Sequence, residues 1–337
     1  MSAEIPAGAM RFNSDSQKLE YWNGSAWFQI HTATPNLATA GDPTPGARGI
    51  VAGGSPTTHG DNIDYINISS TGDAKEFGDL TQNIKYPAGF SSATRGLIGG
   101  GETGGTKLQF IRYITISSTG ATESFGNLGE ARTYMGGCSS ATRGIFGGGK
   151  NPSNTKIADI EYVTIASTGN AVDFGSFATA RGNAGGVSSP TRGVFGGGYN
   201  PTNLKDMEFM TIATTGSING FGDLTQGGLM AANQASNAIR GLYWGGAPHN
   251  NTNIDVITIA TTGNAIKFGD MTVTKAYRNC MTSPTRAVAG GGQTPGDGTV
   301  TIDYVEIATE GNAVDFGDLR EDQHLSGASF SNGHGGL

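Results

Sequence analysis

The sequence predicts an all-β protein whose main part is a six-bladed β-propeller with four-stranded blades, because two sets of residues repeat in step along the chain. An arginine recurs six times at spacings of 46 to 49 residues, and a glycine follows an aromatic or aliphatic residue by seven positions in every copy. The arginines are Arg48, Arg95, Arg143, Arg192, Arg240 and Arg286, and the glycines are Gly72, Gly120, Gly169, Gly216, Gly263 and Gly311. Repeats of roughly 40–50 residues, rich in short β segments, are typical of propellers with one blade per repeat.

One copy, residues 180–224, shows the expected elements of a blade. Four short strands are predicted, at residues 181–188, 192–196, 207–214 and 217–221. The repeated glycine is expected to supply the positive φ of a two-residue hairpin turn between the third and fourth strands. A phenylalanine repeats in the fourth strand and is expected to pack between adjacent blades, since one blade cannot bury both its faces alone. These residues are Phe77, Phe125, Phe174, Phe221, Phe268 and Phe316.

The order of these strands is similar to that of kelch-type β-propellers: a small-residue strand, an apolar strand ending in glycines, an aromatic-bearing third strand and a fourth strand closing on an aromatic. The resemblance covers residues 47–337, with phenylalanine where the kelch family usually has tryptophan. The first copy begins at its second strand, whereas residues 325–332 match a first strand. The C-terminal strand is therefore expected to pair beside residues 49–52 and close the ring, which would leave no open sheet edge.

The first 30 residues predict a small β-meander with strands near residues 10–12, 18–22 and 26–30, followed by a linker at residues 31–46. Asn23-Gly24 is a strong hairpin signal between the last two strands. A meander of this size cannot bury its aromatic side chains by itself. The candidates for attachment or oligomerisation are Phe12, Tyr21, Trp22, Trp27 and Phe28.

Residues 11–27, RFNSDSQKLEYWNGSAW, resemble a short element found near the start of many bacteriophage tail-fibre and other virion proteins, with cyanophages rich in it. The shared pattern is R-(Y/F)-N-(S/T)-D-(S/T)-x-K-L-E-x-(Y/W)-x-G-x-x-W. The resemblance implies location in the virion and contact with other virion proteins through residues 1–46. A homotrimer is the expected assembly, as is common for fibres.

Composition argues against several other classes. A net charge of −7 and the absence of a Lys/Arg run argue against nucleic-acid binding. No apolar stretch approaches the roughly 20 residues of a spanning helix, so membrane insertion is not expected. Cys138 and Cys280 lie three repeats apart and are interpreted as buried thiols on opposite sides of the ring.

The sequence predicts no catalytic residue, no metal site and no cofactor. The five histidines lack metal-ligand spacing, and the Gly-Gly-Gly runs lack the Gly-Lys-Ser/Thr of a phosphate loop. The six repeated arginines are interpreted as structural, donating to carbonyls or to Asp/Asn of a neighbouring blade. The alternative is a ring of arginines that binds an anion.

The copies differ most in the loops just after the glycine runs, between the second and third strands. Because strands alternate in direction, these loops share one face with the connections between blades, and that face is the candidate ligand face. The polar and aromatic residues there suit sugars: Lys150, Tyr199, Asn200, His249, Asn250 and Asn251. The alternative is that these are ordinary solvated loops.

Together these features predict a non-enzymatic phage virion protein, a tail fibre or similar appendage. Its propeller would contact a host-surface glycan or protein, and its N-terminal module would anchor it. The first alternative is a capsid or tail decoration protein with no ligand of its own. A weaker alternative is a glycan-active enzyme on a propeller scaffold.

Overall fold

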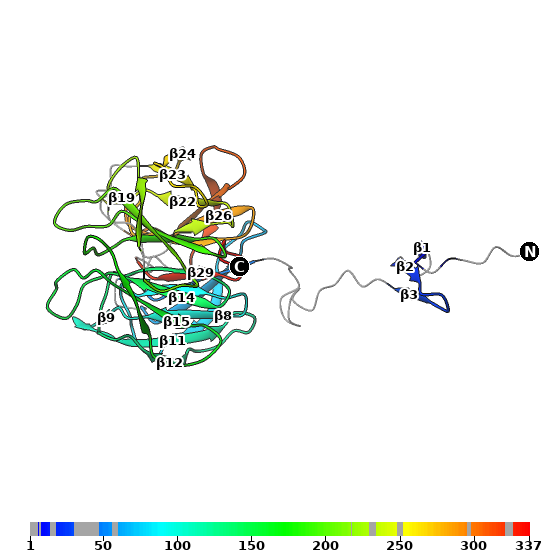
Figure 1. Ribbon diagram of the computed structural model, residues 1–337, viewed down its shortest axis with the longest axis horizontal. Coiled ribbons are helices and arrows are strands. Elements are labelled where there is room, and N and C mark those ends of the chain that lie inside the picture. Colours follow the sequence, from blue (N-terminus) through cyan, green and yellow to red (C-terminus); the bar gives the residue numbers. More distant parts are fainter. Residues whose placement is uncertain are drawn as a thin grey trace, which may run out of the picture. The chain divides into compact units, whose positions relative to one another are not determined.

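The computed structural model describes residue 6 and residues 8–13, 18–29, 47–55, 60–216, 218–228, 234–247, 252–294, 298–320 and 326–337. The chain divides into two compact units, Met1–Pro45 and Gly46–Leu337. All regular elements of the described residues are β-strands (Figure 1), which confirms the all-β prediction. No helix in this part of the chain is long and apolar enough to cross a membrane. The predicted linker at residues 31–46 lies outside the described residues.

The larger unit contains six antiparallel four-stranded sheets in a propeller-like arrangement, numbered I to VI in chain order. Sheet I consists of β29 (Ala328–Ser331), β4 (Arg48–Ala52), β5 (Asn62–Asn67) and β6 (Lys75–Asp79); sheet II of β7 (Ala88–Ser91), β8 (Arg95–Gly99), β11 (Phe110–Thr115) and β12 (Glu123–Asn127). Sheet III consists of β13 (Gly136–Ser139), β14 (Arg143–Gly147), β15 (Asp159–Thr164) and β16 (Val172–Ser176); sheet IV of β17 (Gly185–Ser188), β18 (Arg192–Gly196), β19 (Asp206–Thr211) and β20 (Asn219–Asp223). Sheet V consists of β21 (Ala235–Ser236), β22 (Arg240–Trp244), β23 (Asn253–Thr258) and β24 (Ile266–Asp270); sheet VI of β25 (Asn279–Thr282), β26 (Arg286–Gly290), β27 (Thr301–Glu306) and β28 (Val314–Asp318). A short hairpin, β9 (Glu102–Thr103) and β10 (Thr106–Lys107), lies between β8 and β11.

Sheet I is assembled from the two ends of this unit. The C-terminal strand β29 pairs antiparallel with β4, with Ala328 opposite Ala52 and Ser331 opposite Gly49. The predicted pairing of the last strand beside residues 49–52 is therefore confirmed. Because β29 supplies the first strand of the first sheet, β4 has a partner on both sides.

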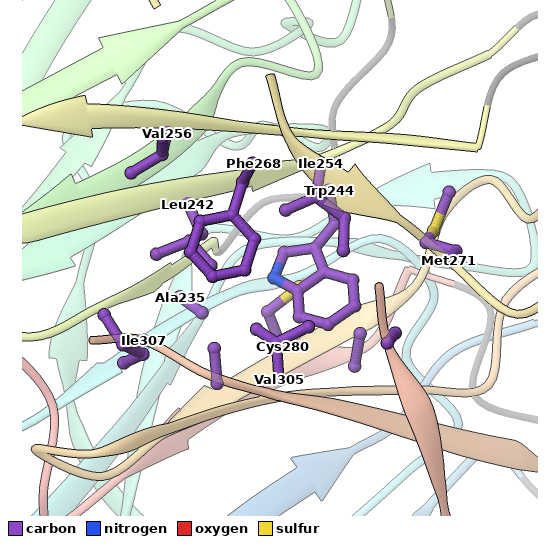
Figure 2. Close-up of a cluster of buried hydrophobic side chains, with 13 residues drawn as sticks. Ala235, Leu242, Trp244, Ile254, Val256, Phe268, Met271, Cys280, Val305 and Ile307 are labelled. Atoms are coloured by element: carbon purple, nitrogen blue, oxygen red, sulfur yellow. The ribbon is translucent and has the colours of Figure 1, made fainter. Parts of the chain in front are cut away.

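The buried hydrophobic residues that the structure describes form six clusters, each of which joins two consecutive sheets. In Figure 2, Phe268 and Trp244 of sheet V pack with Val305 of β27 in sheet VI. Each cluster contains one repeated phenylalanine: Phe77 (I and II), Phe125 (II and III), Phe174 (III and IV), Phe221 (IV and V), Phe268 (V and VI) and Phe316 (VI and I). The prediction that these rings pack between adjacent units is confirmed.

The repeated arginines link the sheets through backbone carbonyls. Each donates from Nη1 to an isoleucine carbonyl just after the third strand of the next sheet, at 2.8–3.4 Å. The pairs are Arg48 to Ile116, Arg95 to Ile165, Arg143 to Ile212, Arg192 to Ile259, Arg240 to Ile307 and Arg286 to Ile68. This confirms the predicted structural role toward carbonyls, and the anion-binding alternative finds no support in these contacts.

The repeated glycines Gly72, Gly120 and Gly216 have the predicted positive φ, but the predicted type of turn is not found. Seven residues, not two, separate β5 from β6, so the two-residue hairpin prediction was wrong. Each glycine N–H instead donates to the carbonyl of the repeated phenylalanine in the preceding sheet, at 2.8–3.1 Å. For example, Gly120 donates to Phe77, and Gly72 donates to Phe316. The approach is close enough that a Cβ on Gly269 would lie 2.0 Å from the Gly311 oxygen. This close approach therefore requires glycine in the fourth strand, whereas a Cβ on any of the six repeated glycines would meet nothing within 4 Å.

Side-chain hydroxyls at the ends of the first strands also join neighbouring sheets. Ser91 Oγ donates to the Ser331 carbonyl at 2.8 Å, and Ser331 Oγ donates to the Thr282 carbonyl at 2.5 Å. Ser139, Ser188 and Ser236 repeat this contact, each to the equivalent residue of the preceding sheet. Five of the six junctions therefore carry a buried hydroxyl-to-carbonyl hydrogen bond.

The C-terminal tail packs against this serine set, which the sequence did not predict. His334 Nε2 lies 2.7 Å from the Ser91 carbonyl, and Gly335 N–H donates to the Ser236 carbonyl. Gly336 N–H donates to His334 Nδ1 at 3.0 Å, so the imidazole is neutral with its proton on Nε2. Burial lowers the pKa of His334 to about 4. A cavity of only about 30 Å³ remains between the tail and the first strands of the six sheets.

The smaller unit is a three-stranded antiparallel meander, as predicted: β1 (Met10–Asn13), β2 (Lys18–Trp22) and β3 (Trp27–Gln29). The Asn23 side chain forms the turn after β2 by accepting hydrogen bonds from Ser25 N and Ala26 N, both at 2.8 Å. The two cysteines of the chain are free and buried, as expected.

Candidate functional site

The connections that follow the second strands lie against the connections between sheets, as predicted for one shared face. Four isolated bridges hold them together: Lys85 with Glu102, Thr133 with Lys150, Gly182 with Tyr199, and Ala276 with Gln293. Each bridge joins a residue just before a first strand to a residue just after a second strand. The variable loops are therefore anchored to the connections beside them.

In each bridge, the residue that follows the partner nearest the first strand adopts an unusual backbone conformation. Tyr86, Tyr134, Asn183 and Tyr277 have φ between 56° and 61°, and Ser326 has φ 50° at the equivalent place in sheet I. The equivalent residue of sheet V lies outside the described residues. Left-handed backbone is unfavourable for tyrosine, costing about 1–2 kcal/mol per residue. Strain of this kind persists only where the surrounding structure fixes the backbone, here at the same position of five repeats.

Four of these residues, all except Ser326, line a cavity of about 390 Å³, which is within the usual range for small-molecule sites. Its lining comes from both kinds of connection: Tyr86, Tyr134, Lys150, Gly182, Asn183, Tyr199, Tyr277 and Gln293. The rings of Tyr86 and Tyr134 stack with centroids 4.2 Å apart and planes 20° apart. Neighbouring connections are also linked directly, because Tyr134 N donates to the Tyr86 carbonyl and Asn183 N donates to the Tyr134 carbonyl.

The environment of the cavity perturbs its titratable groups. Burial and the neighbouring Tyr86 raise the pKa of Tyr134 well above its ordinary value, and burial also raises the pKa of Tyr277. These phenols are therefore neutral hydrogen-bonding groups at physiological pH. Burial, together with Lys156 and Lys107, lowers the pKa of Lys150. The ammonium of Lys150 lies 4.4 Å from the centre of the Tyr134 ring, within cation–π range.

The structure brings together only some of the residues predicted for the ligand face. Lys150 and Tyr199 line the cavity. Asn200 does not, because its Nδ2 donates to the Ala180 carbonyl at 2.8 Å and braces the adjacent connection. His249, Asn250 and Asn251 lie outside the described residues.

Sequence reasoning missed the three tyrosines of the connections, Tyr86, Tyr134 and Tyr277. A signal was present, because all three lie two residues before a first strand, at the same position of their repeats. Loop variability does not point to them, because they lie in the connections before the first strands and not in the loops that follow the second strands.

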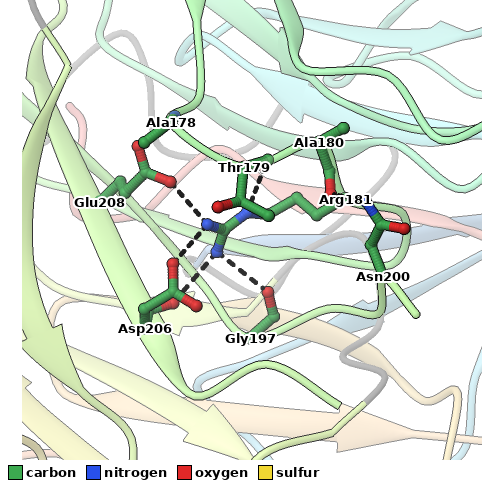
Figure 3. A network of polar contacts seen from close by, with 8 residues as sticks. All are labelled: Ala178, Thr179, Ala180, Arg181, Gly197, Asn200, Asp206 and Glu208. Carbon is green, nitrogen blue, oxygen red and sulfur yellow. Dashed lines mark hydrogen bonds and ion pairs between the residues drawn. The ribbon is translucent and has the colours of Figure 1, made fainter. Parts of the chain in front are cut away.

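The connection beside Tyr199 is held by a buried cation (Figure 3). The Arg181 side chain is fully buried and forms ion pairs with Asp206 and Glu208, the latter at 2.6 Å. It also donates to the Gly197 carbonyl at 3.2 Å. Equivalent ion pairs join Arg132 to Glu161 and Lys275 to Asp303. Removing one partner of such a pair leaves a buried charge uncompensated, so each pair fixes its connection firmly.

The predicted aromatic residues of the smaller unit divide between its two faces. Strand register places Met10, Tyr21 and Phe28 in one row, with Phe12 on the same face. Within this chain all four are exposed: Met10 by 60%, Phe12 by 66%, Tyr21 by 40% and Phe28 by 46%. Trp22 and Trp27 pair on the other face, where the Arg11 guanidinium lies 4.2 Å from the Trp27 ring centre.

In the part of the chain that the structure describes, no three His, Cys, Asp or Glu residues lie together as a metal site would need. The cavity instead combines aromatic rings, a lysine and amide groups, which suit reversible binding of a polar ring compound. Comparison with protein-family models and with curated proteins gives no match for this chain.

Proposed function

We propose that the six sheets are the blades of a closed propeller and that the chain is a bacteriophage virion protein, a tail fibre or similar appendage that contacts the host surface. Ring closure is supported by three contact types that run from sheet VI back to sheet I. These are the Arg286 contact with Ile68, the Gly72 contact with Phe316 and the cluster around Phe316. The proposed role involves binding and no catalysis.

The observation that carries the host-binding role is the tyrosine-lined cavity among the variable connections. Recognition residues commonly lie on loops that a rigid scaffold holds in place. Here the strained backbone, the bridges and the buried ion pairs fix the aromatic rings before any ligand arrives. Preorganisation of this kind reduces the entropic cost of binding. A host-surface glycan fits such a site, because sugar rings present both apolar C–H faces and hydroxyl groups.

The virion assignment is supported by the likeness of residues 11–27 to the N-terminal element of phage virion proteins. The exposed apolar row of the meander supports an assembly role, since a sheet this small is not stable with such a face in water. We propose that this face is covered in a homotrimer or by another virion protein.

An array of bacterial surface polysaccharides probed with the full chain tests the host-binding role. We expect binding to at least one polysaccharide and its loss in Tyr134→Asn. Asparagine tolerates the left-handed conformation, and Asn183 already occupies the equivalent position of another repeat, so this variant keeps the fold. Binding to no polysaccharide would favour a decoration protein without a ligand, and equal binding by the variant would contradict the assignment of the site to this cavity.

A further inference from the structure

We propose that the tyrosine-lined cavity selects a saccharide that carries an anionic group, with a sugar ring against Tyr86 and Tyr134 and the anion beside Lys150. This inference rests on the proposed function, because it assigns the ligand class of the same site. Its two parts are an aromatic wall and a group of lysines beside it.

The aromatic wall is built from the stacked pair Tyr86 and Tyr134, with Tyr277 also lining the cavity. A tyrosine ring offers a flat apolar face and a hydroxyl at its edge. It can therefore contact sugar C–H groups and at the same time form hydrogen bonds with sugar hydroxyls. The Asn183 and Gln293 side chains at the same cavity are amides, which can pair with further hydroxyls.

The lysine group consists of Lys107, Lys150 and Lys156. The backbones of Lys150 and Lys156 form an antiparallel bridge within the connection between β14 and β15. The Lys156 ammonium lies 4.8 Å from the ring centre of Tyr199, another cavity residue. Lys107 Nζ donates to Asn154 Oδ1 of the same connection at 2.7 Å, so β10 brings a third cation to this side.

Glu102 offsets this positive charge only in part: it lies opposite Lys107 in the register of β9 and β10. The contacts found for these three ammonium groups are with aromatic rings and an amide, and none of them forms an ion pair within the described residues. Glu102 is also the carboxylate whose charge acts on Lys150 among the described residues. In a chain of net charge −7, three clustered lysines that form no ion pair within the described residues indicate a site for an anion.

The aromatic wall and the lysines meet at Lys150, which lines the cavity and lies over Tyr134. A ring stacked on the wall would hold an anionic substituent next to this ammonium. A charge-assisted hydrogen bond formed there would be stronger than one between neutral groups. A neutral sugar would leave the lysine charges uncompensated, and a small inorganic anion would leave the tyrosines uncovered.

Isothermal titration calorimetry on the full chain tests the inference with three probes: a galacturonate trisaccharide, the same trisaccharide reduced at its carboxyl groups, and inorganic phosphate. We expect the acidic trisaccharide to bind at least about tenfold more tightly than either of the others, and its binding to weaken as salt screens the charges. Lys150→Gln should remove most of this preference, whereas Lys75→Gln, the same change at an exposed lysine of β6, should leave it intact. Tyr134→Asn should weaken both trisaccharides.

Three results would overturn the inference. Equal binding of the acidic and reduced trisaccharides would contradict selection for an anion but leave a glycan-binding role standing. Phosphate binding as tight as that of the acidic trisaccharide would mean a simple anion site. Binding of none of the probes would contradict the inference, while the polysaccharide array would judge the glycan-binding role independently.

Discussion

The C-terminal strand is expected to contribute a large part of the stability of the six-sheet unit, and Phe330→Ala measures this contribution. Phe330 is 4% exposed and belongs to the cluster between sheets I and II. Its ring lies directly over β8, since a Cβ on Gly96 would be 2.0 Å from it. The contact joins residues more than 200 positions apart in the sequence, so it exists only if the last strand completes the first sheet.

Truncation of a buried phenylalanine typically costs about 3–5 kcal/mol, because it combines lost apolar burial with a residual cavity. For a unit of about 290 residues, an unfolding entropy of about 2.1 cal/mol/K per residue gives about 0.6 kcal/mol/K. The expected fall in Tm is therefore about 5–8 °C by differential scanning calorimetry. Phe12→Ala is the matched control, since Phe12 is 66% exposed in the smaller unit, and it should change this Tm by about 1 °C or less. An unchanged Tm in Phe330→Ala would refute the assigned role of the last strand.

Three further predictions concern the sheet junctions, the tail and the assembly. Gly269→Ala places a Cβ 2.0 Å from the Gly311 oxygen and should lower the free energy of unfolding by about 1–3 kcal/mol in chemical denaturation. Gly220→Ala is the control: its Cβ would meet nothing within 4 Å, so the change should be neutral or stabilising. Equal effects of the two changes would contradict the close approach. Burial lowers the pKa of His334 to about 4 in the folded protein, against about 6.5 in the unfolded chain. Between pH 6.5 and 4 only the unfolded chain therefore protonates this imidazole, and the free energy of unfolding should fall by up to about 3 kcal/mol as the pH is lowered through this range. His334→Gln should lack this component, and identical pH dependence of the two proteins would contradict it. Light scattering should give the full chain three times its 34.6 kDa mass, and Phe12→Ser with Phe28→Ser should reduce it to a monomer; a monomeric parent chain would indicate that another virion protein covers this face.

The features that repeat in the sequence were the ones that could be predicted from it. Each copy buries the same phenylalanine and directs the same arginine at its neighbour, so the repeat reports contacts between sheets. The pairing of β29 with β4 was predictable for the same reason, because the first copy lacks a first strand and the end of the chain supplies one. The length of the turn at the repeated glycines was misjudged, because a positive φ such as that of Gly216 suits longer connections as well as two-residue hairpins.

The candidate site was predicted only in part, because it depends on backbone geometry that tertiary contacts impose. Lys150 and Tyr199 were found from loop variability, but nothing local in the sequence requires Tyr86 or Tyr134 to adopt left-handed backbone. The buried Arg181 pairs join residues 25 and 27 positions apart, and only the folded connections bring them together. His334 follows the last strand and has no counterpart in the other repeats, so its packing against the serines had no sequence signal.

The most direct test of the account is a crystal structure of the full chain with the polysaccharide fragment that binds it best. The account predicts a sugar ring against Tyr86 and Tyr134, within hydrogen-bonding distance of Lys150, on the face formed by the variable connections. A fragment bound elsewhere on the six-sheet unit, with the tyrosine-lined cavity holding only solvent, would contradict the account.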